Sequence, residues 1–549
     1  IYIDRSTNTL TNNTVAGNSA GEGGGGIYTL IGNNILTNNT VTGNEADRGG
    51  GVFISDGTIM LTNNTVTGNS ADDDGGGIFT IESNNTLVNN TVTGNSADDD
   101  GGGIYTEGSN STLVNNTVSG NMASASGGGI YIDFGINSLT NNIIWGNNSG
   151  LEFEAITLTV NHNIIQGGFT GGNNNLDADP LFVTPQSPGQ NTGGDYRLLP
   201  CSPAIDAGTD TGAPTEDILG NLRPIDGNGD ATATTDMGAY EYQSTGGYDT
   251  HIYIDIDATA GNNNGTSWAD AFLNLQDALK AAVSCGVDNI WVAAGTYYPS
   301  AYPAGCADCA SDRDFTFLLP DGVAVYGGFA GTEDPAIFDL ANRDFTAHET
   351  ILSGDIDQDG TFSGNAHHVV LAVDATTRLD GFTVTRGRAN GSGAITVDGE
   401  DIRRSNGGGI YSFFGTNTLS NNTVSGNSAS NFGGGVYTWN GSNTLSSNTV
   451  AGNTANNGGG IFTTFGNHTL TNNTVTGNSG SFGGGIHTSE SVNRLTNNTV
   501  AGNSASNGGG MYIFRSNNTL TNNIIWGNNS GLFVLSSTLP GLSSTLTVN

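Results

Sequence analysis

Positive charge is scarce in this chain. Lysine occurs once, at Lys280, and 14 lysine and arginine residues stand against 51 aspartate and glutamate residues, which gives a formal net charge of −37. Because nucleic acids and anionic membranes are bound through clustered cations, we expect neither as a partner. The sequence also lacks an apolar run of roughly 18 residues, so we expect no membrane-spanning helix.

Cysteine is also rare, with four residues at Cys201, Cys285, Cys306 and Cys309. The segment CADC has the CxxC spacing of redox or zinc sites, but no second pair completes a zinc set. We predict a disulfide between Cys285 and one cysteine of the CADC pair, with free thiols as the alternative. Sparse cysteine beside abundant Asn, Thr and Gly favours an extracellular protein.

A repeat dominates what is present: LTNNTVTGN followed by GGGIYT returns every 25 or 26 residues. A fixed period of this length is typical of stacked coils that cannot bury their apolar faces alone. The 86 glycines and the low charge density resemble those of a disordered chain, but disorder does not hold apolar residues in phase. Three apolar columns keep that phase in the first part of the chain: Ile27, Val52, Ile78, Ile104 and Ile130; Leu36, Leu61, Leu87, Leu113 and Leu139; and Val41, Val66, Val92, Val118 and Ile144.

The columns sit in short β-prone runs such as GIYT, NTLT and NTVT, where alternation sends one side chain inward and its neighbours outward. These runs are too short, and too rich in Gly, Asn and Thr, for helices. We therefore predict an all-β fold of two right-handed parallel β-helix arrays. Each array has coils of about 26 residues, three strands per coil and a core of Ile, Leu and Val.

Two asparagine columns mark the turns: Asn13, Asn39, Asn64, Asn90, Asn116 and Asn142; and Asn18, Asn44, Asn69, Asn95, Asn121 and Asn147. Asparagine tolerates left-handed backbone angles, and amides stacked one coil apart can form hydrogen-bonded ladders. We interpret both columns as such ladders. The NNT triplets, for example at Asn12 and Asn38, are also formal glycosylation acceptors.

The period divides the chain into four parts. We predict a first array over residues 1–161 and a second over residues 376–549. Between them lie a segment without the period, residues 162–243, and the cap and entry strands of the second array, residues 244–375.

Both arrays end with the same sequence. LTNNIIWGNNSGL surrounds Trp145 and again Trp526, and TLTVN ends at Asn161 and again at Asn549. The chain begins partway into an array, without a methionine or signal peptide. We take this as processing or as an excerpt of a longer chain, and we expect somewhat more than one period of a tandem protein.

One good helix is predicted, in SWADAFLNLQDALKAAV. Ser267 is placed as its N-cap, and Trp268, Phe272, Leu275 and Leu279 form its apolar stripe. Strand-like runs at 290–298 and 323–329 follow it. Since an open coil end is a sheet edge ready to pair, we expect this helix to cap the second array.

These segments resemble known families. LQDALKAA followed by WVAAGTYYP resembles the entrance cap of pectin-lyase-like right-handed β-helices, and the VTGNSA and GGGI words resemble the coils of polymorphic outer-membrane-type surface proteins. SPAIDAG with DMGAYEY resembles the region after the β-helix in bacterial surface proteins of the choice-of-anchor Q kind. The resemblance implies secretion and a role at the cell surface or in a matrix.

Two acidic loops are candidate calcium sites. Asp355, Asp357 and Asp359 followed by Gly360 form the DxDxDG start of a calcium loop, although the twelfth position is Ala366 instead of Glu. A second loop has similar spacing and consists of Asp226, Asn228 and Asp230. The alternative for both loops is a solvated turn.

A third acidic candidate comes from stacking, because Asp72, Asp73 and Asp74 share their phase with Asp98, Asp99 and Asp100. Like charges on neighbouring coils repel by about 1 kcal/mol per pair at high dielectric, and a bound cation would relieve that repulsion. The alternative is an acidic edge splayed into water.

An aromatic column follows the aliphatic one, and alternation places it outside the coils. Its members are Tyr2, Tyr28, Phe53, Phe79, Tyr105 and Tyr131, then Tyr411, Tyr437, Phe462, His487 and Tyr512. Such a stripe can bind glycan rings by stacking. The alternative is a ladder that stiffens the sheet or is covered by a loop.

An enzymatic function is disfavoured. A uronate lyase needs cations at the carboxylate and a base, and we expect the arginines between Arg378 and Arg404 to form salt bridges with acidic neighbours such as Asp380. Inward carboxylates of the hydrolase kind are missing from the coils. We expect His367 and His368 to lie in the strand of HHVVLAV.

The sequence thus predicts a non-catalytic, secreted structural protein, a surface or matrix rod or filament of tandem β-helix units that associates with copies of itself. An adhesin or carbohydrate-binding module, with glycans as partners, is the second hypothesis. A polysaccharide lyase is the third. Calcium is the one cofactor we consider.

Overall fold

The computed structural model describes the chain except for a few residues, namely 155–156, 245–246, 249, 260, 536–543 and 549. The closing Asn549 of the second TLTVN word therefore lies outside the described residues. The chain forms two compact units, Ile1–Gly247 and Tyr248–Asn549. Each contains a parallel β-helix, and the predicted fold class is confirmed. Within the described residues, no helix is both long and apolar enough to span a membrane.

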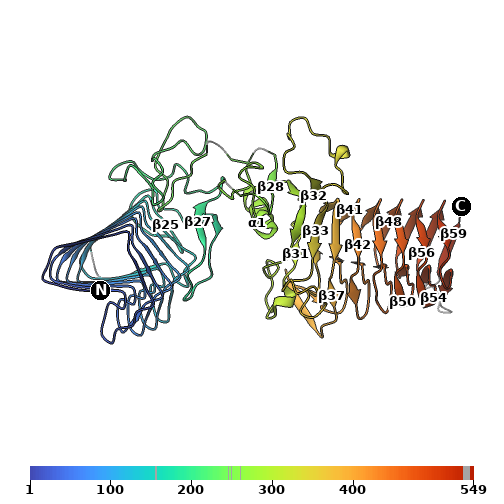
Figure 1. Ribbon diagram of the computed structural model, residues 1–549, viewed down its shortest axis with the longest axis horizontal. Coiled ribbons are helices and arrows are strands. Elements are labelled where there is room, and N and C mark those ends of the chain that lie inside the picture. The colour runs from blue at the N-terminus through green and yellow to red at the C-terminus, as the bar shows by residue number, and fades with distance from the viewer. Residues whose placement is uncertain (155–156, 245–246, 249, 260, 536–543, 549) are drawn as a thin grey trace. The chain divides into compact units, whose positions relative to one another are not determined.

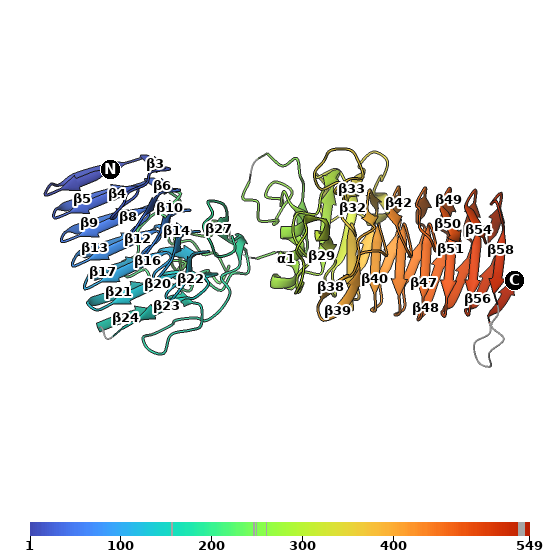
Figure 2. The same cartoon turned by 90° about the horizontal axis from the view of Figure 1, so that it is seen from below.

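Three seven-stranded parallel sheets form the coils of the first unit, and Figure 2 shows their strands in successive layers. The first sheet is β1 (Tyr2–Asp4), β4 (Ile27–Leu30), β8 (Val52–Ser55), β12 (Ile78–Ile81), β16 (Ile104–Glu107), β20 (Ile130–Asp133) and β23 (Leu151–Phe153). The second is β2 (Asn8–Thr11), β5 (Asn33–Thr37), β9 (Thr58–Thr62), β13 (Asn84–Val88), β17 (Asn110–Val114), β21 (Ile136–Thr140) and β24 (Thr157–Asn161). The third is β3 (Thr14–Ala16), β6 (Thr40–Thr42), β10 (Thr65–Thr67), β14 (Thr91–Thr93), β18 (Thr117–Ser119), β22 (Ile143–Trp145) and β25 (Ile164–Ile165).

The register of these sheets is one coil per step, which puts identical residues on top of one another. Ile78 pairs with Ile104, and Val92 pairs with Val118. The three predicted apolar columns form one continuous core cluster, so their inward orientation is confirmed. A fourth sheet of two-residue strands was not predicted: β7 (Glu45–Ala46), β11 (Ser70–Ala71), β15 (Ser96–Ala97) and β19 (Met122–Ala123).

The predicted asparagine ladders are present. The Oδ1 atom of Asn95 accepts hydrogen bonds from the main-chain N (3.0 Å) and the side-chain Nδ2 (2.9 Å) of Asn69, one coil away. Asn95 in turn donates to Asn121 Oδ1 and to the carbonyl of Val66. The left-handed backbone angle falls elsewhere than we expected, on the residue before the ladder amide, such as Asn89 (φ 54°) before Asn90.

The glycine triplets follow from close packing between coils. A Cβ atom on Gly76 would overlap the main-chain oxygen of Ser96, and one on Gly102 would overlap that of Met122. No other residue fits where main chains approach so closely.

Residues 182–242 cover the outer face of the third sheet in the first unit, and we call them the covering segment. It contains an antiparallel pair, β26 (Phe182–Thr184) and β27 (Asp195–Leu198). Its apolar side chains form a second core with Ile143 and Ile164 of the sheet.

The second unit repeats the three-sheet design, and Figure 1 shows its strands in order from β31 to β59. The ten-stranded sheet is β28 (Ile252–Ile254), β29 (Asn289–Ala293), β32 (Ala324–Phe329), β35 (Arg378–Asp380), β41 (Thr418–Ser420), β45 (Thr444–Ser446), β48 (Asn467–Thr471), β52 (Val492–Thr496), β56 (Asn517–Thr521) and β59 (Thr545–Val548). One eight-stranded sheet is β30 (Gly295–Tyr297), β33 (Thr350–Ser353), β36 (Phe382–Thr385), β42 (Thr423–Ser425), β46 (Thr449–Ala451), β49 (Thr474–Thr476), β53 (Thr499–Ala501) and β57 (Ile524–Trp526). The other is β31 (Phe317–Leu318), β34 (Val370–Val373), β40 (Ile410–Phe413), β44 (Val436–Trp439), β47 (Ile461–Thr464), β51 (Ile486–Ser489), β55 (Met511–Phe514) and β58 (Leu532–Leu535).

Shorter elements complete the second unit. They are the parallel pairs β37 (Arg388–Ala389) with β43 (Ser428–Ala429) and β50 (Ser479–Phe482) with β54 (Ser504–Asn507), the hairpin β38 (Ala394–Val397) and β39 (Glu400–Arg403), and the 3-10 turns η1 (Asp312–Asp314) and η2 (Leu340–Asn342).

The α-helix of the second unit is shorter than predicted. It is α1 (Leu275–Cys285), and its N-cap is Asn274, whose side chain accepts from the amide of Gln276. The predicted start at Ser267 is wrong, because the Ser267 hydroxyl bonds Asp270 within a turn before the helix. The helix packs on β28 and β29, the first strands of the unit, as a cap does.

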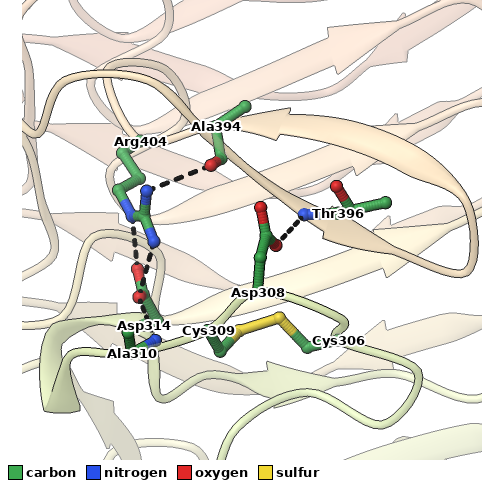
Figure 3. Close-up of a disulfide and its surroundings, with 8 residues drawn as sticks. All are labelled: Cys306, Asp308, Cys309, Ala310, Asp314, Ala394, Thr396 and Arg404. Atoms are coloured by element: carbon green, nitrogen blue, oxygen red, sulfur yellow. Dashed lines mark hydrogen bonds and ion pairs between the residues drawn. A yellow bond between two sulfur atoms is a disulfide. The ribbon is translucent and has the colours of Figure 1, made fainter.

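The predicted disulfide between Cys285 and the CADC pair is wrong. Cys306 and Cys309 bond to each other, and none of the four cysteines is free. This loop runs beside the β38–β39 hairpin, where Asp308 accepts from the amide of Thr396 at 2.6 Å (Figure 3). Nearby, both Asp314 oxygens pair with Arg404, at 2.7 and 2.8 Å.

Candidate functional site

The loop after β33 brings three carboxylates together. One carboxylate oxygen from each of Asp355, Asp357 and Asp359 lies within 4.8 Å of the others, and this is the one such group of acidic, histidine or cysteine side chains among the described residues. Oxygen atoms at that separation can share one Ca²⁺, which binds six to eight oxygens at about 2.3–2.6 Å. The sequence spacing therefore identified side chains that the fold brings together.

Asp355 is the buried member of this loop. The residue is 6% exposed, and its Oδ2 atom accepts from the Gly360 amide and lies 3.3 Å from Arg386. Its Oδ1 atom is buried without any hydrogen-bond partner. A buried carboxylate oxygen without a partner carries a large desolvation cost, which a cation would offset.

The other two carboxylates are exposed. Asp359 accepts from the amide and the hydroxyl of Thr361, and Asp357 lies beside Gly364. Ala366, at the twelfth position, is buried and donates its amide to the Gly354 carbonyl, so it offers no side-chain ligand. The loop thus offers three carboxylates, as its sequence indicates, and lacks the twelfth-position ligand of an EF-hand.

The second acidic loop uses its side chains differently. Asp226 accepts from the amides of Gly229 and Ala231, and Asn228 accepts from that of Asp230. The carboxylates therefore cap main-chain groups of their own turn.

The stacked aspartates also bond to main chain. Asp74 accepts from the amide of Asp100, and Asp100 accepts from that of Ser126, so the column continues from coil to coil. Burial raises the pKa of Asp74 to about 6, although that amide and the charge of Arg48 oppose the shift. Asp72, Asp73, Asp98 and Asp99 are exposed to solvent.

The aromatic column lies outside the coil interior, as alternation predicts, and its rings stack on one another. In the first unit, the ring centroids of neighbouring coils are 4.8 to 5.2 Å apart with interplanar angles of at most 16°. Phe79 is fully buried and Tyr105 is 8% exposed. A sugar ring stacks on an open aromatic face, so this geometry supports the ladder alternative.

In the second unit the aromatic column is covered by loops and by other rings. Tyr411 and Tyr437 are each 1% exposed, and Phe432 from the preceding loop packs 4.7 Å from the ring of Phe462. Burial raises the pKa of Tyr411 and of Tyr437 far above the usual range. His487 and Tyr512 continue the column, each 6% exposed.

Four arginines at the start of the second array are paired with carboxylates. Arg378 and Arg343 contact Asp380, and Arg386 contacts Asp355. Arg404 pairs with Asp314. Salt bridging is therefore confirmed for Arg378, Arg386 and Arg404, although two of the acidic partners were not foreseen from the sequence. Arg388 instead donates to the carbonyl of Phe362.

The histidine pair is placed differently from our expectation, because His367 and His368 precede β34 instead of lying in it. Both are buried, and burial lowers the pKa of His367 to about 3 and that of His368 to about 4. A base with so low a pKa is a poor proton acceptor at neutral pH.

Several charged residues of the covering segment escaped our sequence reasoning. Arg223 and Glu241 form a fully buried ion pair at 2.7 Å, and Asp236 is buried beside them. Burial, and then the charge of Glu241, raises the pKa of Asp236 well above its usual value. The only sequence signal was the acidic residues in the words SPAIDAG and DMGAYEY. Asp206 of the first word accepts from the amides of Gly227 and Asn228.

A cavity of about 690 Å³ lies between α1 and the first coils of the second unit. Leu279, Leu319 and Val373 line its apolar part, and Lys280 and Tyr302 stand at it. The lining also carries five carboxylates: Asp277, Asp321, Asp374, Asp398 and Glu400. Sequence spacing gave no indication of this cavity, because its residues come from distant segments.

The sequence matches the model of a family described as right handed beta helix region over residues 1–179 and 357–547. No curated protein matches the chain. Among solved structures, the crystal structure of pectate lyase Pel9A is similar at 13% identity and a TM-score of 0.31, over 55% of this chain and 77% of that one. A similarity of that size supports no inference about activity.

Proposed function

Because this chain belongs to the right-handed β-helix family, we propose that it is a non-catalytic, secreted structural protein of the cell surface or matrix. Its stacked coils form rigid rods, and tandem β-helix units associate with copies of one another into a filament. We propose that it lies outside the cell and that its partners are copies of itself.

The proposal is supported by the structural role of nearly every repeated position in a coil. The inward positions hold apolar columns, the turns hold asparagine ladders, and the aromatic column stacks on itself. The glycine triplets allow main chains of adjacent coils to approach closely. Such repeated contacts stiffen a solenoid along its axis, and they leave few positions for convergent chemical groups.

A lyase function has less support. Arg343, Arg386 and Arg404 are held by carboxylates, so their charges are already neutralised. His367 and His368 are buried with strongly lowered pKa values. A uronate would find neither a free cation pair nor a base at these residues.

The same proposal includes a structural Ca²⁺ at Asp355, Asp357 and Asp359. The buried Oδ1 atom of Asp355, which has no partner in the protein, supports it together with the convergence of the three carboxylates. The loop follows β33, so a bound ion would tie the loop to the first coils of the second unit. Its effect would be on stability.

An adhesive function is the second candidate, and the cavity beside α1 favours it. Its volume of about 690 Å³ and its mixture of apolar walls with Tyr302 and carboxylates suit a small ligand or a glycan end. Substitution of Tyr302 by Ser would weaken such binding.

A glycan array with and without calcium separates the candidates. The structural proposal predicts no selective retention on any glycan class, and no unsaturated, ultraviolet-absorbing products from uronate polymers. Selective retention that Tyr302→Ser abolishes would favour the adhesin. Accumulation of unsaturated products would contradict the non-catalytic proposal directly.

A further inference from the structure

In the first unit, the outer face formed by the late strands of the third sheet is a built interface. The covering segment packs Met237, Ile205 and Tyr242 against Ile143, which is fully buried there, and Trp145 packs against the same cluster. Ile143 and Trp145 point outward from the coil, so their burial depends on this segment.

Three turn asparagines bind the main chain of the covering segment. Asn141 donates to the carbonyl of Thr209 at 2.8 Å and accepts from its amide at 2.9 Å. Asn115 donates to the carbonyls of Asp236 and Gly238, at 2.9 and 3.1 Å. Asn89 donates to the carbonyl of Glu216 at 2.7 Å.

These asparagines all have a left-handed backbone, which is why their side chains project from the turns toward the segment. The φ angles of Asn89, Asn115 and Asn141 are 54°, 53° and 56°. All three are at most 1% exposed.

The second unit repeats the turn asparagines and the last strand of this face. Asn472, Asn497 and Asn522 occupy the equivalent turns with φ angles of 57°, 55° and 55°. The thirteen letters LTNNIIWGNNSGL recur unchanged, so that Ile524 and Trp526 take the places of Ile143 and Trp145.

Exposure is the difference between the two faces. Ile524 is 58% exposed and Trp526 is 77% exposed, and the three asparagines are exposed as well. The outward positions of β42, β46, β49 and β53 on this sheet are Thr, Ser or Ala, so the two large apolar side chains stand beside a surface of small residues. The exposed Ile524 and Trp526 lie beside the amide groups of three asparagines whose backbone angles match those of the first unit. Such a combination marks an interaction surface.

We propose that the face of β49, β53 and β57 with Asn472, Asn497 and Asn522 is the docking site of a further copy of the covering segment. The occupant has the chemistry of residues 182–242: main-chain carbonyls for the three amides, and an apolar cluster for Ile524 and Trp526. The duplicated contact residues carry this choice of partner.

The test adds a copy of residues 162–243 after residue 549 of the full chain, with Cys201→Ser in the added copy. That copy contains no tryptophan. Iodide quenching of Trp526 fluorescence is obtained as the difference between each protein and its Trp526→Phe variant. We expect the quenching constant of Trp526 to fall several-fold in the extended chain, and the emission to shift to shorter wavelength.

A matched control uses Asn497→Gly with Asn522→Gly in the extended chain. Both residues are exposed and have φ angles of 55°, which glycine adopts without strain, so the substitutions remove the amides, leave the coils intact and should restore the quenching of Trp526. Because Ile143 and Ile164 belong to the core of the native segment, the added copy needs the array face in order to fold. Unchanged quenching in the extended chain therefore overturns the proposal. Protection of Trp526 in the unextended chain that grows with protein concentration also overturns it, since a second molecule would then be the occupant.

Discussion

Asn38 and Asn39 are neighbours in the chain and have opposite surroundings. Asn39 is 1% exposed, and its Nδ2 atom donates to the Leu10 carbonyl and to Asn64 Oδ1. Asn38 is exposed in the left-handed turn position, with φ 55°. An amide is required at Asn39 because its side chain must both donate and accept within one column. The position of Asn38 requires only a residue that tolerates a left-handed backbone angle.

Substitution of Asn39 by Asp replaces two donors with a carboxylate facing two acceptor oxygens. We expect Asn39→Asp to lower the free energy of unfolding of the first unit by at least about 3 kcal/mol, because a buried charge loses its hydrogen bonds. Asn38→Asp is the control and should change it by less than about 0.5 kcal/mol. Urea denaturation of both variants measures the difference, and equal effects would refute the ladder as a source of stability.

At the scale of elements, the first turn of α1 depends on Asn274. Its side chain accepts from the amide of Gln276, whereas Ser267 lies in a separate turn that bonds Asp270. A helix N-terminus has unpaired amides, and one side-chain acceptor satisfies part of them.

We expect Asn274→Ala to destabilise the second unit by about 1 kcal/mol, since the cap is lost while the packed face of the helix remains. Ser267→Ala tests the start of the helix that the sequence suggested. Thermal unfolding followed by circular dichroism compares the two, and an equal or larger loss for Ser267→Ala at the helix itself would contradict the observed start.

The calcium loop is the second element with a measurable effect. We expect the melting temperature of the second unit to rise with Ca²⁺ and to fall on chelation, because an ion bound only to the folded state stabilises it. Asp357→Asn should abolish that response. The matched control is Asp230→Asn, whose side chain caps main-chain groups of the other acidic loop and should leave the response intact. If chelation leaves the melting temperature unchanged, the loop does not bind a stabilising calcium ion.

The residues differ in how far they were predictable from the sequence. The apolar columns, the ladders and the convergence of Asp355, Asp357 and Asp359 follow from period and spacing, which are local properties. The start of α1 was missed because the apolar stripe predicted for the helix extends upstream to Trp268. The Trp268 ring instead packs against Tyr253 and Phe329. The Cys306–Cys309 pairing and the cavity beside α1 depend on loops that meet only in the folded chain. The repeat pattern of the sequence therefore does not predict them.

At the scale of the whole molecule, the two units differ in their buried titratable groups. In the first unit, burial raises the pKa of Asp74 to about 6 and raises that of Asp236 well above its usual value. In the second, burial lowers the pKa of His367 to about 3 and that of His368 to about 4.

The two units should therefore respond oppositely to acid. A carboxyl whose pKa is raised on folding favours the folded state at low pH, and this contribution is lost as the pH rises through about 6. A histidine whose pKa is lowered on folding favours the folded state above about 6.5, and the contribution is lost as the pH falls toward about 4. Between those limits, acidification should stabilise the first unit and destabilise the second.

Hydrogen exchange measured by mass spectrometry resolves this by unit, after correction for the intrinsic pH dependence of exchange. His368→Asn should reduce the acid sensitivity of the second unit and leave the first unchanged. Parallel loss of protection in both units on acidification would show that these groups do not control stability.

The structural proposal also makes its clearest prediction at this scale. Stacked parallel coils pack about 4.8 Å apart along the axis of each array, and a filament of tandem units would repeat at a fixed distance. Electron microscopy of native material tests this most directly. The account predicts rods or filaments with a regular axial repeat, and dispersed globular monomers at high protein concentration would contradict it.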